Sequence, residues 1–183
     1  QQAFLQSKRP EEQPLYAAYP TGFKKPGHAL KILRYLYGLK DSPMGFFLTV
    51  KKHLIEDQSF VQSKNDDCLF VKYRAGSESD RARITALEKA GGDHEAVYPA
   101  PVELGDVSAA VVLHVDDFAS TGEDGAVAEY RQQLHKRFIM TGGLIKEYYG
   151  LDVRVRDGEI TLGGTGYIGR MLTKLGVLQV PPG

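Results

Sequence analysis

The stretch AAVVLHVDDFASTG, residues 109–122, limits which fold the chain can form. An apolar run at 109–113 leads to His114, and the chain becomes small and apolar again after two adjacent aspartates, Asp116 and Asp117. A short apolar run that is rich in β-branched residues predicts a buried strand. We therefore expect a strand that ends near this aspartate pair, and a hairpin turn that carries both carboxylates at one edge of a sheet.

The aspartate pair is a candidate site for a divalent cation. Adjacent carboxylates repel each other unless a cation neutralises them, and Mg²⁺ binds through one or two carboxylates together with substrate phosphates. A turn or a helix N-terminus that happens to contain two aspartates is the commoner explanation of such a dipeptide taken alone. A calcium-binding loop that starts at Asp116 is excluded, because Phe118 and Ser120 occupy its third and fifth positions and Thr121 stands where glycine is required.

The charges of the 183-residue chain are balanced overall but unevenly distributed. Lys plus Arg equals Asp plus Glu at 23 each. Residues 24–74 carry ten basic and five acidic side chains, whereas residues 75–125 carry three basic and eleven acidic ones. A basic half beside an acidic half fits a phosphate-binding surface next to a metal-binding carboxylate centre, and it also fits an ordinary dipolar surface.

Other bulk features exclude several classes of protein. The single cysteine, Cys68, excludes an internal disulfide and argues against a zinc site. No apolar run approaches membrane-spanning length, and no signal peptide is visible. The chain begins with Gln1 rather than Met, so we expect a piece of a longer polypeptide.

Periodicity and turn signals predict the helices and strands. They are helices at 44–57, 82–90, 123–138 and 165–175, and strands at 1–6, 29–36, 68–73, 148–155 and 160–162. We expect Asp124 to cap the third helix and Asp157-Gly158 to form a tight hairpin. A second acid pair, Asp66-Asp67, lies in a polar stretch and is interpreted as turn chemistry. The last helix is expected to direct five apolar residues inward: Tyr167, Ile168, Met171, Leu172 and Leu175.

Seven short motifs occur in an order that resembles the reverse transcriptases of Ty1/copia retrotransposons. They are AFLQ (3–6), YPTGF (19–23), LYGLKDSP (36–43), FVQSKNDDCLFVK (60–72), HVDD (114–117), YYGLDV (148–153) and YIGRML (167–172). Each motif is weak alone, whereas the ordered set is specific and covers nearly the whole chain. The exception is residues 75–107, which are longer than the corresponding stretch of the family.

The resemblance implies an α+β fold, namely a polymerase palm with a fingers subdomain in the right-hand arrangement of reverse transcriptases, without a thumb. Residues 1–183 would then be a fragment of a reverse transcriptase domain. Within it, residues 24–74 would form the fingers/palm junction and residues 108–176 the palm with its catalytic hairpin. Residues 75–107 would be an atypical insertion, which we expect to be exposed and mobile.

The implied activity is RNA-directed DNA polymerisation, a nucleotidyl transfer that uses two Mg²⁺ or Mn²⁺ ions. One ion activates the primer 3′-hydroxyl, and the other holds the triphosphate and neutralises the leaving pyrophosphate. The implied partners are an RNA or DNA template with its primer, deoxynucleoside triphosphates, and the integrase and RNase H regions of the same polyprotein, with no membrane. The implied location is intracellular, in a cytoplasmic virus-like particle or in the nucleus.

The resemblance also assigns roles to individual residues. Asp116 and Asp117 would be catalytic residues and metal ligands, and His114 would replace the family's tyrosine beneath the primer end. Phe4 would exclude a ribose 2′-hydroxyl, unless it is simply a core residue. Lys146 is a candidate general acid for the pyrophosphate. The other implied contacts are to the nucleotide, from Ala3, Phe4, Tyr37, Gly38 and Lys40, and to primer or template, from Lys31 and Arg34.

Departures from the family leave a second reading open. The family has Gln where Asp41 stands, Arg where Met44 stands, and polar residues where Gly163-Gly164 stands. By the family's spacing its first catalytic aspartate lies two residues before Gln1, so we expect the chain as given not to extend a primer. The alternative is therefore a degenerate or domesticated palm domain that binds nucleic acid without catalysis.

Overall fold

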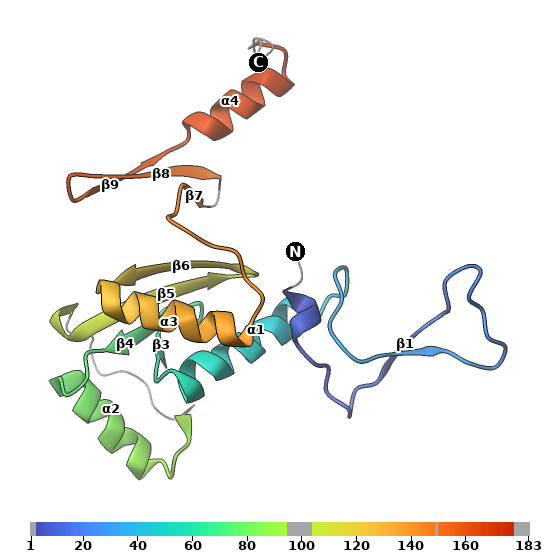
Figure 1. Cartoon of the computed structure of the whole chain (residues 1–183), viewed down its shortest axis with the longest axis horizontal. Helices are drawn as coiled ribbons and strands as arrows, with labels where there is room; N and C mark the ends of the chain where they lie inside the picture. Colours follow the sequence, from blue (N-terminus) through green and yellow to red (C-terminus); the bar gives the residue numbers. More distant parts are fainter. Residues whose placement is uncertain (1–2, 95–103, 149, 178–183) are drawn as a thin grey trace. The chain divides into compact units, whose positions relative to one another are not determined.

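The computed structural model describes residues 3–94, 104–148 and 150–177. The structure is of mixed α+β type, with helices and short antiparallel strands along the chain (Figure 1). The chain divides into two units, Gln1–Met140 and Thr141–Gly183, which are described separately. No helix in the described part is long and apolar enough to cross a membrane.

The larger unit is built on a four-stranded antiparallel sheet. Its strands lie in the order β3 (Val61–Gln62), β4 (Leu69–Tyr73), β5 (Val107–His114) and β6 (Asp117–Gly122). β5 pairs with β6 from Ala109 opposite Gly122 to His114 opposite Asp117. The expected buried strand and hairpin are therefore confirmed, but only Asp116 lies in the turn, and Asp117 is the first residue of β6.

One hydrophobic core joins this sheet to the helices of the unit. α1 (Ser42–Lys52) continues into a π-helical turn, η2 (His53–Asp57), and α3 (Asp124–Arg137) follows β6. Both predicted helices are thus present, and Pro43 stands in the first turn of α1, where its missing N–H costs nothing. Sheet, helices and their connections supply the largest core side chains: Phe46, Val50, Leu54, Phe60, Phe70, Val111, Leu113, Tyr130, Leu134 and Phe138.

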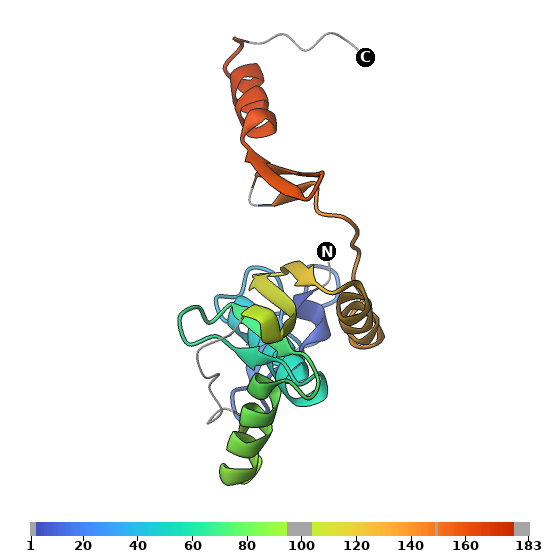
Figure 2. The same ribbon diagram turned by 90° about the vertical axis from the view of Figure 1, so that its left-hand side faces the viewer.

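The 75–107 segment contains α2 (Glu78–Lys89), which begins earlier than the sequence predicts. Its start is tied to the short helix η4 (Leu104–Asp106), because the Ser79 N–H and hydroxyl both donate to one Asp106 carboxylate oxygen, at 3.0 and 2.7 Å. These hydrogen bonds hold the pKa of Asp106 below its usual value. No residue of α2 is buried, and the helix projects from the unit (Figure 2). The remainder of the expected insertion, 95–103, lies outside the described residues.

Two local predictions for the larger unit are wrong, and a third is correct only in part. Residues 3–6 are not the end of a strand: η1 (Phe4–Gln6) is a 3₁₀ turn, because the Gln6 N–H donates to the Ala3 carbonyl at 3.0 Å, and residues 1–2 lie outside the described part. The strand expected at 29–36 is only β2 (Leu30–Ile32), which forms a two-stranded ribbon with β1 (Leu15–Ala17). Asp124 is the first helical residue of α3 rather than its cap, and Glu123 at the cap position makes no capping hydrogen bond.

The smaller unit is a three-stranded antiparallel sheet followed by one helix. Its elements are β7 (Glu147–Tyr148), β8 (Leu151–Arg156), β9 (Glu159–Gly163) and α4 (Thr165–Lys174). The Asp157-Gly158 hairpin is confirmed, and both of its turn residues have positive φ, at 51° and 81°.

The inward orientation predicted for the last helix is wrong. α4 contacts the strands through its polar side: the Gly166 N–H donates to Asp152 at 2.8 Å, and Arg170 pairs with Glu147 at 3.0 Å. The apolar stripe of α4 is consequently uncovered within this unit, and four of its members are exposed: Tyr167, Ile168, Met171 and Leu175.

Removing one hydroxyl from the core is expected to stabilise the protein. Tyr130 is 1% exposed, its ring packs edge-to-face on Phe60 at 5.5 Å, and its hydroxyl has no hydrogen-bond partner among the described residues. Burying an unpaired hydroxyl costs free energy, so Tyr130→Phe should raise the free energy of unfolding by about 1 kcal/mol in urea denaturation. The exposed Tyr16→Phe change is the control and should have no effect.

The same variant should also change the response to alkali. Burial raises the pKa of Tyr130 in the folded state, whereas the unfolded chain ionises near the ordinary value of about 10. The wild type therefore loses stability as the pH rises above about 10, because only its unfolded form releases this proton readily. The difference in the free energy of unfolding between the wild type and Tyr130→Phe should therefore increase above this pH. A destabilised variant would show that the hydroxyl has a partner, such as a buried water.

Candidate metal and nucleotide site

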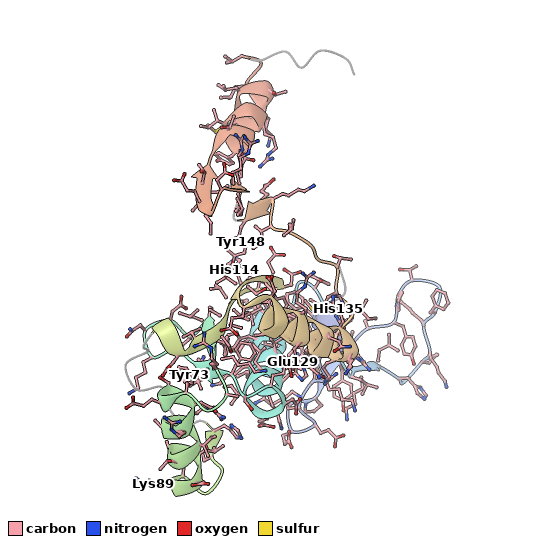
Figure 3. All side chains as sticks on the ribbon, turned by 60° about the vertical axis from the view of Figure 1, so that its left-hand side comes forward. Tyr73, Lys89, His114, Glu129, His135 and Tyr148 are labelled. Atoms are coloured by element: carbon pink, nitrogen blue, oxygen red, sulfur yellow. The ribbon has the colours of Figure 1, made fainter. Side chains whose placement is uncertain are left out.

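The β5–β6 hairpin presents the aspartate pair at its tip. Its turn contains only two residues, Val115 and Asp116, between the paired His114 and Asp117. Two-residue hairpin turns require positive φ, and Val115 has φ of 54°, which costs a β-branched residue about 1–3 kcal/mol. His114, Asp116 and Asp117 are all exposed, and Figure 3 shows His114 at the end of the hairpin.

The base of the hairpin is rigid because β5 lies in the interior of the sheet. Ala109, Val111 and Leu113 are almost completely buried, and Leu113 pairs with the half-buried Phe118 of β6. The apolar run therefore holds the backbone in a fixed register, and the exposed carboxylates follow directly from it. A site built on a strand in this way is positioned more accurately than one on a loop.

The donor set at the hairpin tip fits a magnesium ion. Asp116 and Asp117 offer exposed carboxylate oxygens, the ligands that Mg²⁺ prefers, and Mg²⁺ takes its remaining ligands from water or phosphate. Within the described residues no group of three His, Cys, Asp or Glu side chains converges to hold a metal. Two carboxylates alone would leave most ligands of a bound Mg²⁺ to be supplied by water or by a phosphate-bearing ligand.

The second acid pair lies in a different environment. Asp66 accepts a hydrogen bond from the Cys68 N–H at 2.8 Å, and the Asp67 carbonyl accepts one from the Gln62 side chain at 2.7 Å. These bonds close the turn before β4, so the interpretation of Asp66-Asp67 as turn chemistry is confirmed. Burial, and to a lesser degree the two carboxylates, raises the pKa of the Cys68 thiol, which keeps it unreactive at neutral pH.

Phe4 and Tyr37 of the expected nucleotide site lie against each other. Their ring centroids are 4.5 Å apart, and Phe4 also packs edge-to-face on Phe46 at 6.1 Å. Phe4 is 6% exposed, whereas Tyr37 is about half exposed. Phe4 is thus a core residue, as the simpler interpretation of the sequence holds, and Tyr37 presents the accessible ring. Ala3 packs beside them against the same core.

Asp41 has a role that the sequence does not reveal. It accepts a hydrogen bond from Arg9 at 2.7 Å, and the guanidinium of Arg9 lies over the Tyr35 ring, 5.0 Å from its centroid. The Arg9 side chain is only 7% exposed, so Asp41 neutralises an almost buried cation. No local pattern signals this pair, because its members are 32 positions apart in the sequence.

The structure brings some of the predicted site residues together. The hairpin turn lies at the same end of the larger unit as η1 and the start of α1 (Figure 1). Arg34 is tied to this end, because it donates to the Leu5 carbonyl at 2.8 Å.

Two further predicted site residues belong to other elements of the chain. Lys31 stands on the exposed face of β2, away from the short loop that carries Lys40. Lys146 belongs to the smaller unit, where it is exposed and its carbonyl accepts a hydrogen bond from Val153 at 2.8 Å.

Comparisons of the chain with protein-family models, with curated proteins and with solved structures find no match.

Proposed function

We propose that this chain is the palm, with part of the fingers, of an RNA-directed DNA polymerase of the Ty1/copia reverse transcriptase type. The observation that carries the proposal is the position of Asp116 and Asp117 at the tip of a two-residue hairpin whose first strand is buried. The ordered motifs of the sequence support it, as does the α+β architecture around the hairpin.

In this proposal each residue of the site has its own role in the reaction. Asp116 and Asp117 hold the divalent ions, and His114, opposite Asp117 in the register, lies beneath the primer end. Bound there, two Mg²⁺ or Mn²⁺ ions supply activation of the primer 3′-hydroxyl and neutralisation of pyrophosphate. Tyr37 packs on Phe4 and offers its exposed ring to the sugar of the incoming deoxynucleotide. Lys40 is exposed beside it, where a cation attracts the triphosphate.

The second candidate is a palm domain that binds nucleic acid without polymerising. Two observations favour it. Asp41, at the position of the family's glutamine, is engaged by Arg9 rather than free for a nucleotide. Met44 is 60% exposed where the family has a cation, so this position presents no charge to a phosphate. Metal binding separates the two candidates, because a non-catalytic domain needs no ion at the hairpin.

Metal titration is the test. Mn²⁺ added to the full chain should broaden the NMR amide signals of the hairpin tip at 114–117 selectively, because a paramagnetic ion relaxes nearby nuclei. Asp116→Asn should abolish this broadening and leave the melting temperature unchanged or higher, since it removes a repulsion between two exposed carboxylates.

Asp67→Asn is the matched control for this experiment. It neutralises one member of the other adjacent acid pair, and it leaves the hydrogen bond of Asp66 intact. This variant should bind Mn²⁺ at the hairpin as the wild type does. Equal broadening in the wild type and Asp116→Asn would overturn the metal site, and broadening centred on 66–67 would place the ion at the wrong pair.

A further inference from the structure

The ribbon of β1 and β2 extends from the core as an antiparallel pair that a turn at residues 10–14 interrupts. Near the core, the Arg9 N–H donates to Leu33 and the Tyr35 N–H donates to Ser7, at 3.1 and 3.2 Å. Farther out, Tyr16 pairs with Lys31, and twelve residues, 18–29, connect the two strands. The ribbon is therefore anchored at one end and presents its connecting loop at the other.

The outer part of the ribbon carries cations and no acids, and the two acids of the ribbon, Glu11 and Glu12, lie in the turn before β1. Residues 13–40 contain no Asp or Glu, and their five basic residues are Lys24, Lys25, Lys31, Arg34 and Lys40. In the described part of the chain none of the four lysines forms an ion pair. Several cations elsewhere are paired, for example Arg74 with Glu123 and Lys72 with Glu129. Residues 7–40 thus carry seven basic and two acidic side chains, which leaves the ribbon with a net positive charge.

Exposed aromatic rings are interleaved with these cations. Tyr16 and Lys31 are cross-strand partners on the outer face of the ribbon, and Tyr16 is 58% exposed. Phe23 is 75% exposed and immediately precedes Lys24 and Lys25. Exposing a phenylalanine to this degree gains no burial energy, so folding does not explain its presence.

The connecting loop is locally ordered around these rings. The Phe23 N–H donates to the Pro20 carbonyl at 3.0 Å, and the His28 N–H donates to the Lys25 carbonyl at 3.2 Å. The Nδ1 atom of His28 also forms a hydrogen bond with the Pro26 carbonyl oxygen, at 2.8 Å. Two consecutive turns thus fix the backbone on either side of Lys24, which lowers the entropy lost when a ligand binds.

We propose that this ribbon, residues 13–40, binds single-stranded nucleic acid, with Phe23 and Tyr16 stacking on bases and Lys24, Lys25 and Lys31 contacting phosphates. The proposal rests on the proposed function for the presence of a nucleic acid, and it adds the strandedness and the surface. Unpaired bases offer their faces to aromatic side chains, whereas a duplex hides them. An acidic polypeptide would satisfy the lysines but would leave the rings without a partner.

Stacking is tested by anisotropy of a labelled oligo-dT with the full chain. Phe23→Ala should weaken binding about tenfold, because one base–aromatic stack is lost, and Phe23→Trp should retain or improve it. Leu33→Ala is the matched control: Leu33 is 67% exposed on the same ribbon but is not aromatic, so its loss should leave Kd unchanged. Unchanged affinity in Phe23→Ala, or a preference of the wild type for duplex, would overturn the proposal.

The cationic contribution is tested by salt dependence. Replacing Lys24 and Lys25 together by Gln should lower the slope of log Kd against log salt by about 1.4, because each phosphate contact contributes about 0.7 on a single strand. Lys89→Gln, at the exposed end of α2, should leave the slope unchanged. Equal competition by polyglutamate and by unlabelled oligo-dT would show a general anion surface instead and would overturn the proposal.

The binding of oligo-dT by the ribbon is independent of the metal site. Oligo-dT binding by the ribbon needs no divalent ion, so the wild type should bind it equally well with EDTA and with Mn²⁺. If the hairpin fails to bind Mn²⁺ while the Phe23 effect is seen, the polymerase proposal fails and the ribbon proposal stands. If the hairpin binds Mn²⁺ and the chain does not bind oligo-dT, the ribbon proposal fails and the polymerase proposal stands.

Discussion

Phe46→Ala should lower the free energy of unfolding by about 3–5 kcal/mol, the range found when a phenylalanine is removed from a core. Phe46 is 2% exposed and stands between Phe4 and Phe138, with ring centroids 6.1 and 5.9 Å away. Its loss removes apolar burial and two edge-to-face contacts, and it leaves a cavity lined by other aromatic rings. Because a domain of this size is typically stable by about 5–15 kcal/mol, the variant should be marginal.

Urea denaturation followed by circular dichroism measures this effect. Phe23→Ala makes the same chemical change at a site that is 75% exposed, and it should shift the midpoint very little. If both variants lose the same stability, Phe46 does not belong to a packed core, and the arrangement of α1 on the sheet is wrong.

Gly45→Ala should destabilise the larger unit by about 2–3 kcal/mol, although alanine normally stabilises a helix by about 1 kcal/mol relative to glycine. A Cβ at this position of α1 would overlap the Tyr35 ring, with Cε1 only 2.6 Å away. The ring cannot move aside easily, since Tyr35 is buried and the Arg9 guanidinium lies over it. The clash therefore outweighs helix propensity.

Gly125→Ala provides the control of opposite sign. Gly125 lies in the first turn of α3, and an added Cβ would meet no atom within 4 Å. The substitution should raise the free energy of unfolding by up to about 1 kcal/mol. Thermal melts of both variants against wild type decide the comparison. A stabilised Gly45→Ala would mean that Tyr35 does not pack on α1.

The parts of the fold that the sequence predicts are those with a strong local pattern. The apolar run of β5, the 3.6-residue spacing in α1 and α3, and the Asp157-Gly158 turn each specify their own conformation through neighbouring residues. The orientation of α4 fails for a related reason. An apolar stripe shows which side of a helix avoids water, but it does not show which surface covers that side.

The candidate site likewise contains features that the sequence predicts and features that depend on tertiary contacts. The location of Asp116 in the hairpin turn, with Asp117 directly after it, is predictable, because an apolar strand leads directly into them. The pairing of Asp41 with Arg9 is not, because it depends on how the ribbon returns to the core. The burial of Phe4 is likewise a tertiary property, since it depends on rings from Tyr37 and α1.

The two-residue turn of the hairpin restricts how this region can change during evolution. Along each strand, successive side chains point alternately to the core face and to the outer face of the sheet. If the two-residue turn is kept, inserting or deleting one residue between His114 and Asp117 would shift the register of β6, so that Phe118 would turn outward and the Asp117 carboxylate would turn toward the core. Burying that charge would unfold the hairpin. Point substitutions at the tip are therefore compatible with folding, whereas changes in its length are eliminated with the fold itself.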